Sequence, residues 1–201
     1  MITYTNTALI VFVRPPELGK VKTRLAKTIG DERALAIYRL LLNHTLEITK
    51  PLLFQKFIYY TDVVVENDQW NESGYTKRKQ SGNNLGEKMQ HAFDELLVEG
   101  FEKVLIIGSD CYQLQTLTIE KAVDKLHTHS VVLGPTYDGG YYLLGMNAFI
   151  PALFENKTWS TDQVLTESIA DLNRLNTSYS LLETLHDVDE EADLVVSGIR
   201  I

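Results

Sequence analysis

The stretch Ala8-Leu-Ile-Val-Phe-Val13 predicts a β-strand at the centre of the protein. It is apolar throughout and rich in β-branched residues, which is typical of a strand whose sheet is covered by helices on both faces. The run ends at Arg14-Pro15-Pro16, where proline interrupts strand pairing. Apolar residues at helical spacing then extend from about Asp31 to Pro51. The first quarter of the chain therefore predicts one buried strand and one helix.

The alternation of strands and helices continues along the chain. Further strands are predicted at 56–61, near 75–80, and at 103–107, 130–133, 141–144 and 179–183. Helices are predicted at about 85–98 and 117–127, from a capping box at Ser160 and Gln163 to about 175, and in the acidic C-terminal segment. Such alternation favours a mostly parallel sheet between two layers of helices, and the short link between 133 and 141 predicts one antiparallel pair. We expect an α/β fold with three αβα layers, a mixed, mostly parallel central sheet, and a single domain spanning 1–201.

Composition and charge exclude several classes of protein. With 201 residues, 44% hydrophobic and 23% charged, the chain has the composition of a globular protein. Its formal net charge of −8 disfavours binding to nucleic acid or to anionic membranes. The apolar run 8–13 is too short to span a bilayer, and the N-terminus lacks the pattern of a signal peptide. A single cysteine, Cys111, suits a reducing compartment, so we expect a cytoplasmic protein.

The charges are unevenly distributed along the sequence. Basic residues crowd the N-terminal fifth and acidic residues crowd the region from Glu183 to Asp193. If the two regions meet in space, sites for an anion and for a cation lie side by side. The alternative is two separate, solvated faces.

The loop after the first strand is a candidate phosphate site. Gly19 stands within a group of cations and one hydroxyl that we predict to bind phosphate: Arg14, Lys20, Lys22, Thr23 and Arg24. The loop is not a Walker A motif, because Val21 follows Lys20 and no glycine lies five residues before Gly19. A basic surface loop is the other interpretation.

Asp110 follows the apolar strand 103–107, at the sheet edge where open α/β sheets bind ligands. One or two such carboxylates, with phosphate oxygens, commonly hold Mg²⁺. The alternative is a carboxylate that caps the next loop or helix. The neighbouring Cys111 is interpreted as a small buried packing residue rather than a nucleophile.

Two further loops carry acidic residues at the same edge. Asp138 is followed by Gly139, Gly140 and Tyr141, a pattern that suits a base or sugar but is also a common hairpin turn. Asp138 is the candidate catalytic residue. Near the end of the chain, Asp189 can complete a metal site with Asp110, or it can cap the last helix, and Asp187 lies on the same side if the backbone is extended.

Taken together, these motifs resemble a bacterial family of small GT-A-like proteins assigned as nucleotide-diphospho-sugar transferases, some of them described as arsenosugar-biosynthesis glycosyltransferases. The likeness covers nearly the whole chain. Beyond the loops above, it rests on Gln80-Ser-Gly-Asn-Asn-Leu-Gly-Glu-Lys-Met89, on Leu133-Gly-Pro-Thr-Tyr-Asp-Gly-Gly-Tyr-Tyr-Leu-Leu-Gly145 and on Trp159-Ser-Thr161. The chain differs from the family pattern at Asn84, at Tyr112-Gln113 and at Glu190-Glu-Ala192.

The resemblance implies a nucleotide-diphospho-sugar transferase fold with the phosphates on the first loop. Gln80 and Gly86 then lie near the nucleobase, and Trp159 joins the Asp138 loop in binding substrate. Asp110 stands where GT-A proteins place the acid of their metal motif, and Asp189 where related nucleotidyltransferases place a second metal ligand. The implied cofactor is Mg²⁺ or Mn²⁺.

The expected function is glycosyl transfer from a nucleotide sugar to a small-molecule acceptor. Nucleotidyl transfer from a nucleoside triphosphate fits the same residues, but it normally uses a more glycine-rich first loop. A nucleotide-binding protein with weak activity is the third interpretation, and Asn84 and Gln113 are the residues that favour it. The nucleobase, the sugar, the acceptor and the oligomeric state, a homodimer included, are left open by the sequence.

Overall fold

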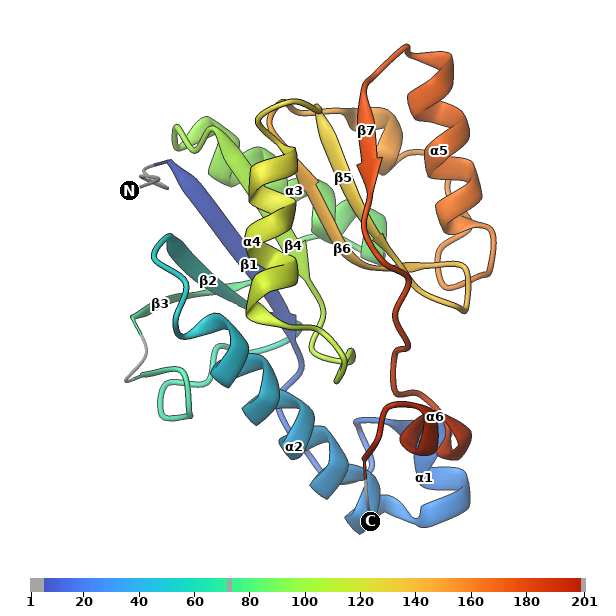
Figure 1. Cartoon of the computed structure of the whole chain (residues 1–201). Helices are drawn as coiled ribbons and strands as arrows, with labels where there is room; N and C mark the ends of the chain where they lie inside the picture. The colour runs from blue at the N-terminus through green and yellow to red at the C-terminus, as the bar shows by residue number, and fades with distance from the viewer. Residues whose placement is uncertain (1–5, 72–73, 200–201) are drawn as a thin grey trace.

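The computed structural model describes residues 6–71 and 74–199. Seven strands in this part of the chain form one sheet, and helices cover both of its faces (Figure 1). The strands are β1 Thr7–Val13, β2 Gln55–Tyr60, β3 Tyr75–Lys79, β4 Lys103–Ile107, β5 Val131–Pro135, β6 Tyr141–Met146 and β7 Tyr179–Leu181. The helices are α1 Thr23–Ile29, α2 Asp31–Thr49, α3 Leu85–Val98, α4 Thr116–Lys125, α5 Val164–Arg174 and α6 Glu191–Val196, with a short 3₁₀ turn at Pro151–Leu153.

The sheet has the strand order β3-β2-β1-β4-β6-β5-β7. Strand β6 runs antiparallel to its neighbours β4 and β5, and the other four neighbouring pairs are parallel. The predicted mixed, mostly parallel sheet is therefore confirmed. The carboxyl ends of β1, β4, β5 and β7 reach the same edge, where the chain continues into the loops predicted to hold the site.

The two faces of the sheet are packed by alternate residues of the same strands. Leu9 and Val11 of β1 belong to a core cluster with α2 and α4, whereas Ala8 and Ile10 belong to a second cluster with α3 and α5. All four side chains are completely buried. This explains why the run 8–13 lacks the polar alternation of a half-exposed strand.

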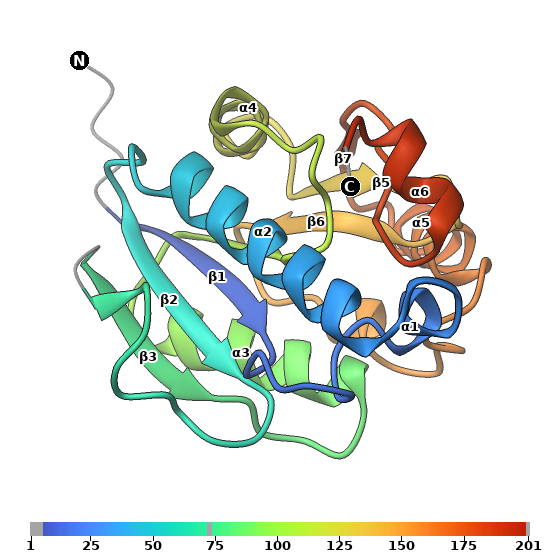
Figure 2. The ribbon, with the colours of Figure 1, turned by 90° about the horizontal axis from the view of Figure 1, so that it is seen from below.

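A third, smaller core lies beyond the carboxyl edge of the sheet. Leu25 of α1 and Leu41 of α2 pack there against Val188 and Leu194. Figure 2, which views the molecule from below, shows α1 and α6 side by side at this end. The basic N-terminal region and the acidic C-terminal region therefore meet in space, as one interpretation of the charge pattern required.

Most predicted elements are present, but one helix was not predicted and another begins later than predicted. Helix α1 was not expected, because its seven residues are too few to show helical periodicity. Helix α5 begins at Val164, so the predicted capping box at Ser160 is wrong: Ser160 has a left-handed backbone with φ of 64° and lies outside the helix.

The last helix is capped by Glu190. The sequence had left open that Asp189 caps it. Glu190 and Asp193 form the capping box of α6. The Asp189 carboxylate is therefore not used as a cap. Within residues 6–71 and 74–199, no helix combines the length and apolar character needed to cross a membrane.

The packing of β5 on β6 predicts a severe effect for one small substitution. A Cβ atom on Gly134 would lie 2.4 Å from Cζ of Tyr142, whose ring is 3% exposed and whose hydroxyl donates to the Glu183 carbonyl. We expect Gly134→Ala to lower the free energy of unfolding by about 1–3 kcal/mol, the usual cost of overpacking a core. Urea denaturation measures this difference.

The matched control is Gly108→Ala. A Cβ atom there meets nothing closer than the Asp110 amide nitrogen at 4.0 Å. Its effect should stay within about 0.5 kcal/mol. Equal stability of the two variants would contradict the packing argument.

Candidate functional site

Lys22 connects three of the predicted segments at the carboxyl edge of the sheet. Its Nζ atom lies 2.7 Å from Oδ1 of Asp110 and 3.1 Å from Oδ1 of Asp189. Arg24 adds a second cation, with Nη1 3.6 Å from Oδ2 of Asp189. The first loop, the loop after β4 and the segment after β7 therefore converge on one ammonium group.

The ammonium group is buried while its partners are partly open to solvent. The Lys22 side chain is 5% exposed, compared with 43% for Asp110 and 46% for Asp189. Burial alone would lower the pKa of Lys22, but the charges and hydrogen bonds of the two carboxylates outweigh burial and raise this pKa above its usual value. Lys22 therefore remains charged at neutral pH.

Hydrogen bonds of the backbone fix the segments that carry Asp110 and Asp189. The Val188 amide donates to the Asp110 carbonyl at 2.9 Å, which ties the segment after β7 to the loop after β4. The amides of Asp189 and Glu190 donate to Oδ2 of Asp193 at 2.9 and 2.7 Å. The predicted pairing of Asp110 with Asp189 is thus present, with Lys22 between them.

Two more acids surround this pair. Burial, followed by the charges of Asp110 and Asp138, raises the pKa of Asp187 to about 8. Asp138 itself accepts hydrogen bonds on Oδ1 from the Thr136 hydroxyl and from the Gly140 amide, the latter at 3.1 Å. The Asp138 side chain therefore makes the turn that the sequence allowed, and it also adds charge to the acidic cluster of Asp110, Asp138, Asp187 and Asp189.

The glycines of the Asp138 loop are required by contacts within the protein. Gly139 has φ of 88°, and a Cβ atom on it would lie 2.2 Å from the Asp162 carbonyl oxygen. Its own carbonyl accepts from the Leu165 amide at 2.9 Å. At Gly140 a Cβ atom would lie 3.1 Å from the Thr136 hydroxyl. These contacts hold the loop against the start of α5.

Trp159 and Gly86, predicted from separate motifs, are in direct contact. A Cβ atom on Gly86 would lie 2.2 Å from Nε1 of Trp159, so only glycine allows the indole this close to α3. A cavity of about 370 Å³ adjoins the indole. It is lined by Asn84, Glu87, Phe154, Glu155, Asn156, Lys157 and Trp159.

Three other residues that the sequence singled out lie wholly or partly in the protein interior. Gln80 is buried, and its amide nitrogen donates to the Tyr59 carbonyl at 2.9 Å. The Tyr141 ring packs in the core with α3 and α5, and its hydroxyl has no hydrogen-bond partner within the described residues. Their side chains thus lie in the protein interior. Cys111 is also buried, which raises the pKa of its thiol to about 12 and confirms it as a packing residue.

The remaining cationic loop residues lie at the surface. Lys20 is exposed and pairs with Glu17 at 2.5 Å. Arg14 is exposed, and its backbone is fixed by the Tyr38 hydroxyl, which accepts from the Arg14 amide at 2.9 Å and donates to the Arg14 carbonyl at 3.0 Å. Thr23, also exposed, is the first residue of α1.

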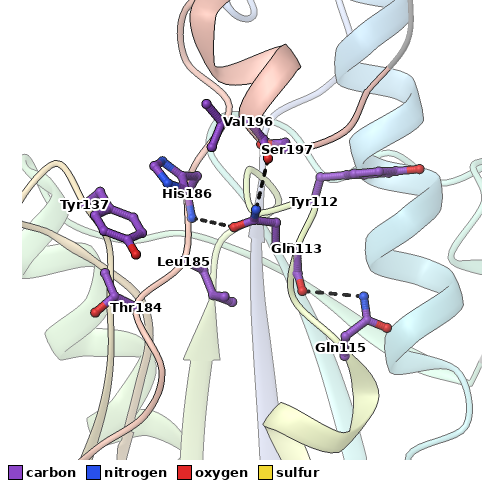
Figure 3. Close-up of a pocket in the computed structure, with 9 residues that line it drawn as sticks. All are labelled: Tyr112, Gln113, Gln115, Tyr137, Thr184, Leu185, His186, Val196 and Ser197. Carbon is purple, nitrogen blue, oxygen red and sulfur yellow. Dashed lines mark hydrogen bonds between the residues drawn. The ribbon is translucent and has the colours of Figure 1, made fainter.

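A second cavity of about 600 Å³ contains none of the predicted site residues (Figure 3). Tyr137 and His186 stack in its wall with their ring centroids 4.1 Å apart, and Gln113 accepts from the His186 amide at 3.0 Å. Tyr137 precedes Asp138 and His186 precedes Asp187, so each ring belongs to a direct sequence neighbour of an acid in the cluster. The aromatic pair was missed in the sequence, where its only signal was adjacency to the two acids.

The donor set at the edge fits a hard divalent cation. Asp110 and Asp189 offer two partly exposed carboxylates, and Mg²⁺ typically binds one or two carboxylates together with phosphate and water. Mn²⁺ accepts the same oxygen ligands. No group of three or more His, Cys, Asp or Glu side chains suited to a metal occurs in the described parts of the chain. Further ligands of a cation held there would therefore come from substrate and solvent.

Similar structures are known. A protein from Desulfovibrio desulfuricans G20 named "putative nucleotide-diphospho-sugar transferase" is 29% identical, with a TM-score of 0.88 over 95% of this chain and 85% of that chain. A CMP:2-keto-3-deoxy-manno-octonic acid synthetase complexed with CTP is 8% identical, with a TM-score of 0.57 over 97% and 98% of the two chains. Rv0371c from Mycobacterium tuberculosis H37Rv, in complex with manganese, is 11% identical, with a TM-score of 0.56 over 96% and 97%.

These similarities confirm the predicted nucleotide-diphospho-sugar transferase fold. No curated protein matches the chain. Residues 47–161 match a family described as "Uncharacterized protein conserved in bacteria (DUF2064)". This match covers more than half of the sequence, and the chain therefore belongs to the DUF2064 family.

Proposed function

We propose that this protein is a glycosyltransferase that binds a nucleotide-diphospho-sugar with a divalent cation and transfers the sugar to a small-molecule acceptor. The observation that carries the proposal is the convergence of Lys22, Arg24, Asp110 and Asp189 at one sheet edge. Cations for a diphosphate and carboxylates for a metal ion are there within hydrogen-bonding or ion-pair distance of each other. The 29% identity to the Desulfovibrio protein supports the same substrate class.

The chemistry that this arrangement supports is electrostatic. When the bond between sugar and diphosphate breaks, negative charge develops on the departing nucleoside diphosphate. Arg24, which is 63% exposed, can donate two hydrogen bonds to phosphate oxygens. A divalent cation on Asp110 and Asp189 would neutralise further charge on the same group.

The sugar and its acceptor are assigned to the region between Trp159 and the Asp138 loop. The indole supplies a flat, partly exposed surface, and the cavity beside it is large enough for a monosaccharide-sized group. The Asp138 carboxylate is held by Thr136 and Gly140, so its direction is set before substrate binds. We assign it the task of orienting or deprotonating the acceptor hydroxyl.

Three further properties belong to this proposal. The continuous sheet supports a single domain spanning 1–201. The cation is assigned as Mg²⁺ or Mn²⁺ from the donor set. The cytoplasmic location remains a prediction from the sequence.

A ligand panel tests the substrate class. The melting temperature is measured with nucleotide sugars, nucleoside diphosphates and nucleoside triphosphates, each with and without Mn²⁺. At a hundredfold excess over Kd, a bound nucleotide sugar should raise the melting temperature by roughly 5–10 °C. Selective stabilisation by a triphosphate would favour nucleotidyl transfer instead, and a response to none of these compounds would contradict the proposal.

Arg24→Ala tests the phosphate contact. Loss of a hydrogen bond to a charged group costs ~1.5–3 kcal/mol, so diphosphate affinity measured by calorimetry should fall about ten- to hundredfold. The control is Lys27→Ala, an exposed cation in the last turn of the same helix. Equal losses for the two variants would indicate a general charge effect and not a specific contact.

Asp138→Asn separates catalysis from turn formation. Asparagine keeps the Oδ1 acceptor for Thr136 and Gly140 and supports the same turn, so the fold should be unchanged. It cannot accept a proton, so turnover should fall by roughly 10²-fold or more while nucleotide affinity stays constant. Full activity of this variant would reduce Asp138 to a turn residue.

A further inference from the structure

We propose that Lys22 is a displaceable internal counter-ion, which pairs Asp110 with Asp189 until a substrate phosphate draws its ammonium group away and a divalent cation takes its place. The inference rests on the proposed function for the identity of the phosphate. It makes metal binding and diphosphate binding mutually dependent.

The ammonium group lies where a shared metal ion would bind. At 2.7 Å from Asp110 and 3.1 Å from Asp189, its contacts are those of charge-assisted hydrogen bonds to both carboxylates. A divalent cation held by Asp110 and Asp189 would lie close to this positive charge. The two cations therefore exclude each other unless Lys22 moves.

Lys22 does not form an ordinary surface ion pair. Its side chain is almost fully buried, whereas the nearby Lys20–Glu17 pair is 73% and 50% exposed. Its backbone has φ of 47° and ψ of 45°, a left-handed conformation that is unfavourable for a non-glycine residue. Strained backbone of this kind is found preferentially at ligand clamps and switch regions.

The surroundings favour displacement by a phosphate. The two carboxylates are nearly half exposed, so solvent and ions reach them although the ammonium group is covered. A lysine has a flexible four-carbon stem, and the exposed Arg24 lies close enough to bind the same phosphate. A phosphate that arrives there offers Lys22 a new anionic partner.

Displacement of Lys22 alone would leave the acidic cluster without its buried cation. Asp110 and Asp189, which both contact the Lys22 ammonium group, would then repel each other. A divalent cation removes this repulsion, and a phosphate supplies the ligands that two carboxylates lack. Each ligand therefore increases the affinity for the other, which is positive coupling between the two.

The decisive experiment measures Mn²⁺ binding in the absence of nucleotide. Lys22→Met removes the ammonium group and keeps a side chain of similar length, so we expect it to bind Mn²⁺ at least tenfold more tightly than the wild type, as measured by electron paramagnetic resonance. Lys27→Met, on the exposed side of α1, should leave the affinity within twofold. Lys22→Met with Asp110→Asn should lose the gain.

Stability measurements keep the test valid if Lys22→Met is poorly folded. We expect this variant to melt at a lower temperature than the wild type and to recover most of the loss when Mn²⁺ is added. Lys22→Gln, which retains one hydrogen-bond donor for a carboxylate, should show the same rescue with a smaller initial loss. A structural role alone would lower the melting temperature without rescue by Mn²⁺.

The coupling is tested with pyrophosphate, which needs no knowledge of the nucleobase. In the wild type, Mn²⁺ and pyrophosphate together should raise the melting temperature more than the sum of their separate effects. In Lys22→Met, Mn²⁺ alone should already raise the melting temperature. Equal Mn²⁺ affinity in wild type and Lys22→Met would overturn the proposal and make Lys22 a permanent counter-ion. Since the Mn²⁺ measurements contain no nucleotide, failure of the proposed function in the ligand panel would leave their result interpretable.

Discussion

The burial of β1 and β4 on both faces determines where chemistry can occur in this molecule. Alternate residues of each strand enter two different cores, so the buried segments 8–11 and 104–107 carry no polar side chain. At the carboxyl edge of these two strands, ionisable groups are consequently confined to the segments beyond the strand ends. Arg14 and Asp110 are the first ionisable residues after β1 and β4, and the parallel direction of these strands brings both segments to the same edge.

Electrostatics then organises that edge. The protein is acidic overall, and four acidic side chains gather where β4, β5 and β7 end, which is unfavourable without a compensating charge. The first loop supplies it by burying Lys22 among them. The small core of α1, α2 and α6 supports this arrangement. Leu25, three residues after Lys22, packs in the same core as Val188, the residue before Asp189.

The sequence was most informative where a pattern is continuous. The apolar runs at 8–13 and 103–107 and the helical period at 85–98 predicted β1, β4 and α3 within one residue at each end. Helix α1 was not predicted, because its seven residues, about two turns, are too few to show a period. The start of α5 was misplaced because a Ser–Gln spacing is also compatible with a left-handed turn before the helix.

The sequence predicted which residues form the candidate site, but only some of the contacts between them. Strand order brought Asp110 to the same edge as Asp189, which the topology of an open sheet allows one to expect. Which cation would lie between them could not be predicted, because that depends on the left-handed backbone of Lys22 and on the position of the unexpected α1. The burial of Gln80 and Tyr141 could not be predicted either, since residue identity alone does not say whether an amide or a phenol faces solvent or protein.

The site combines acids on well-fixed segments with cations held by ion pairs. The Asp138 carboxylate accepts two hydrogen bonds in a loop that Gly139 holds against α5, and the backbone amide of Asp189 donates to the Asp193 carboxylate. Lys22 and Arg24, by contrast, are held at the site through the side-chain ion pairs that they form with the acids. In the proposed transfer reaction the diphosphate must enter, carry growing charge and leave, so its cationic partners would gain from freedom to follow it. The acids, to which we assign the positioning of the reaction partners, would gain from being set in advance.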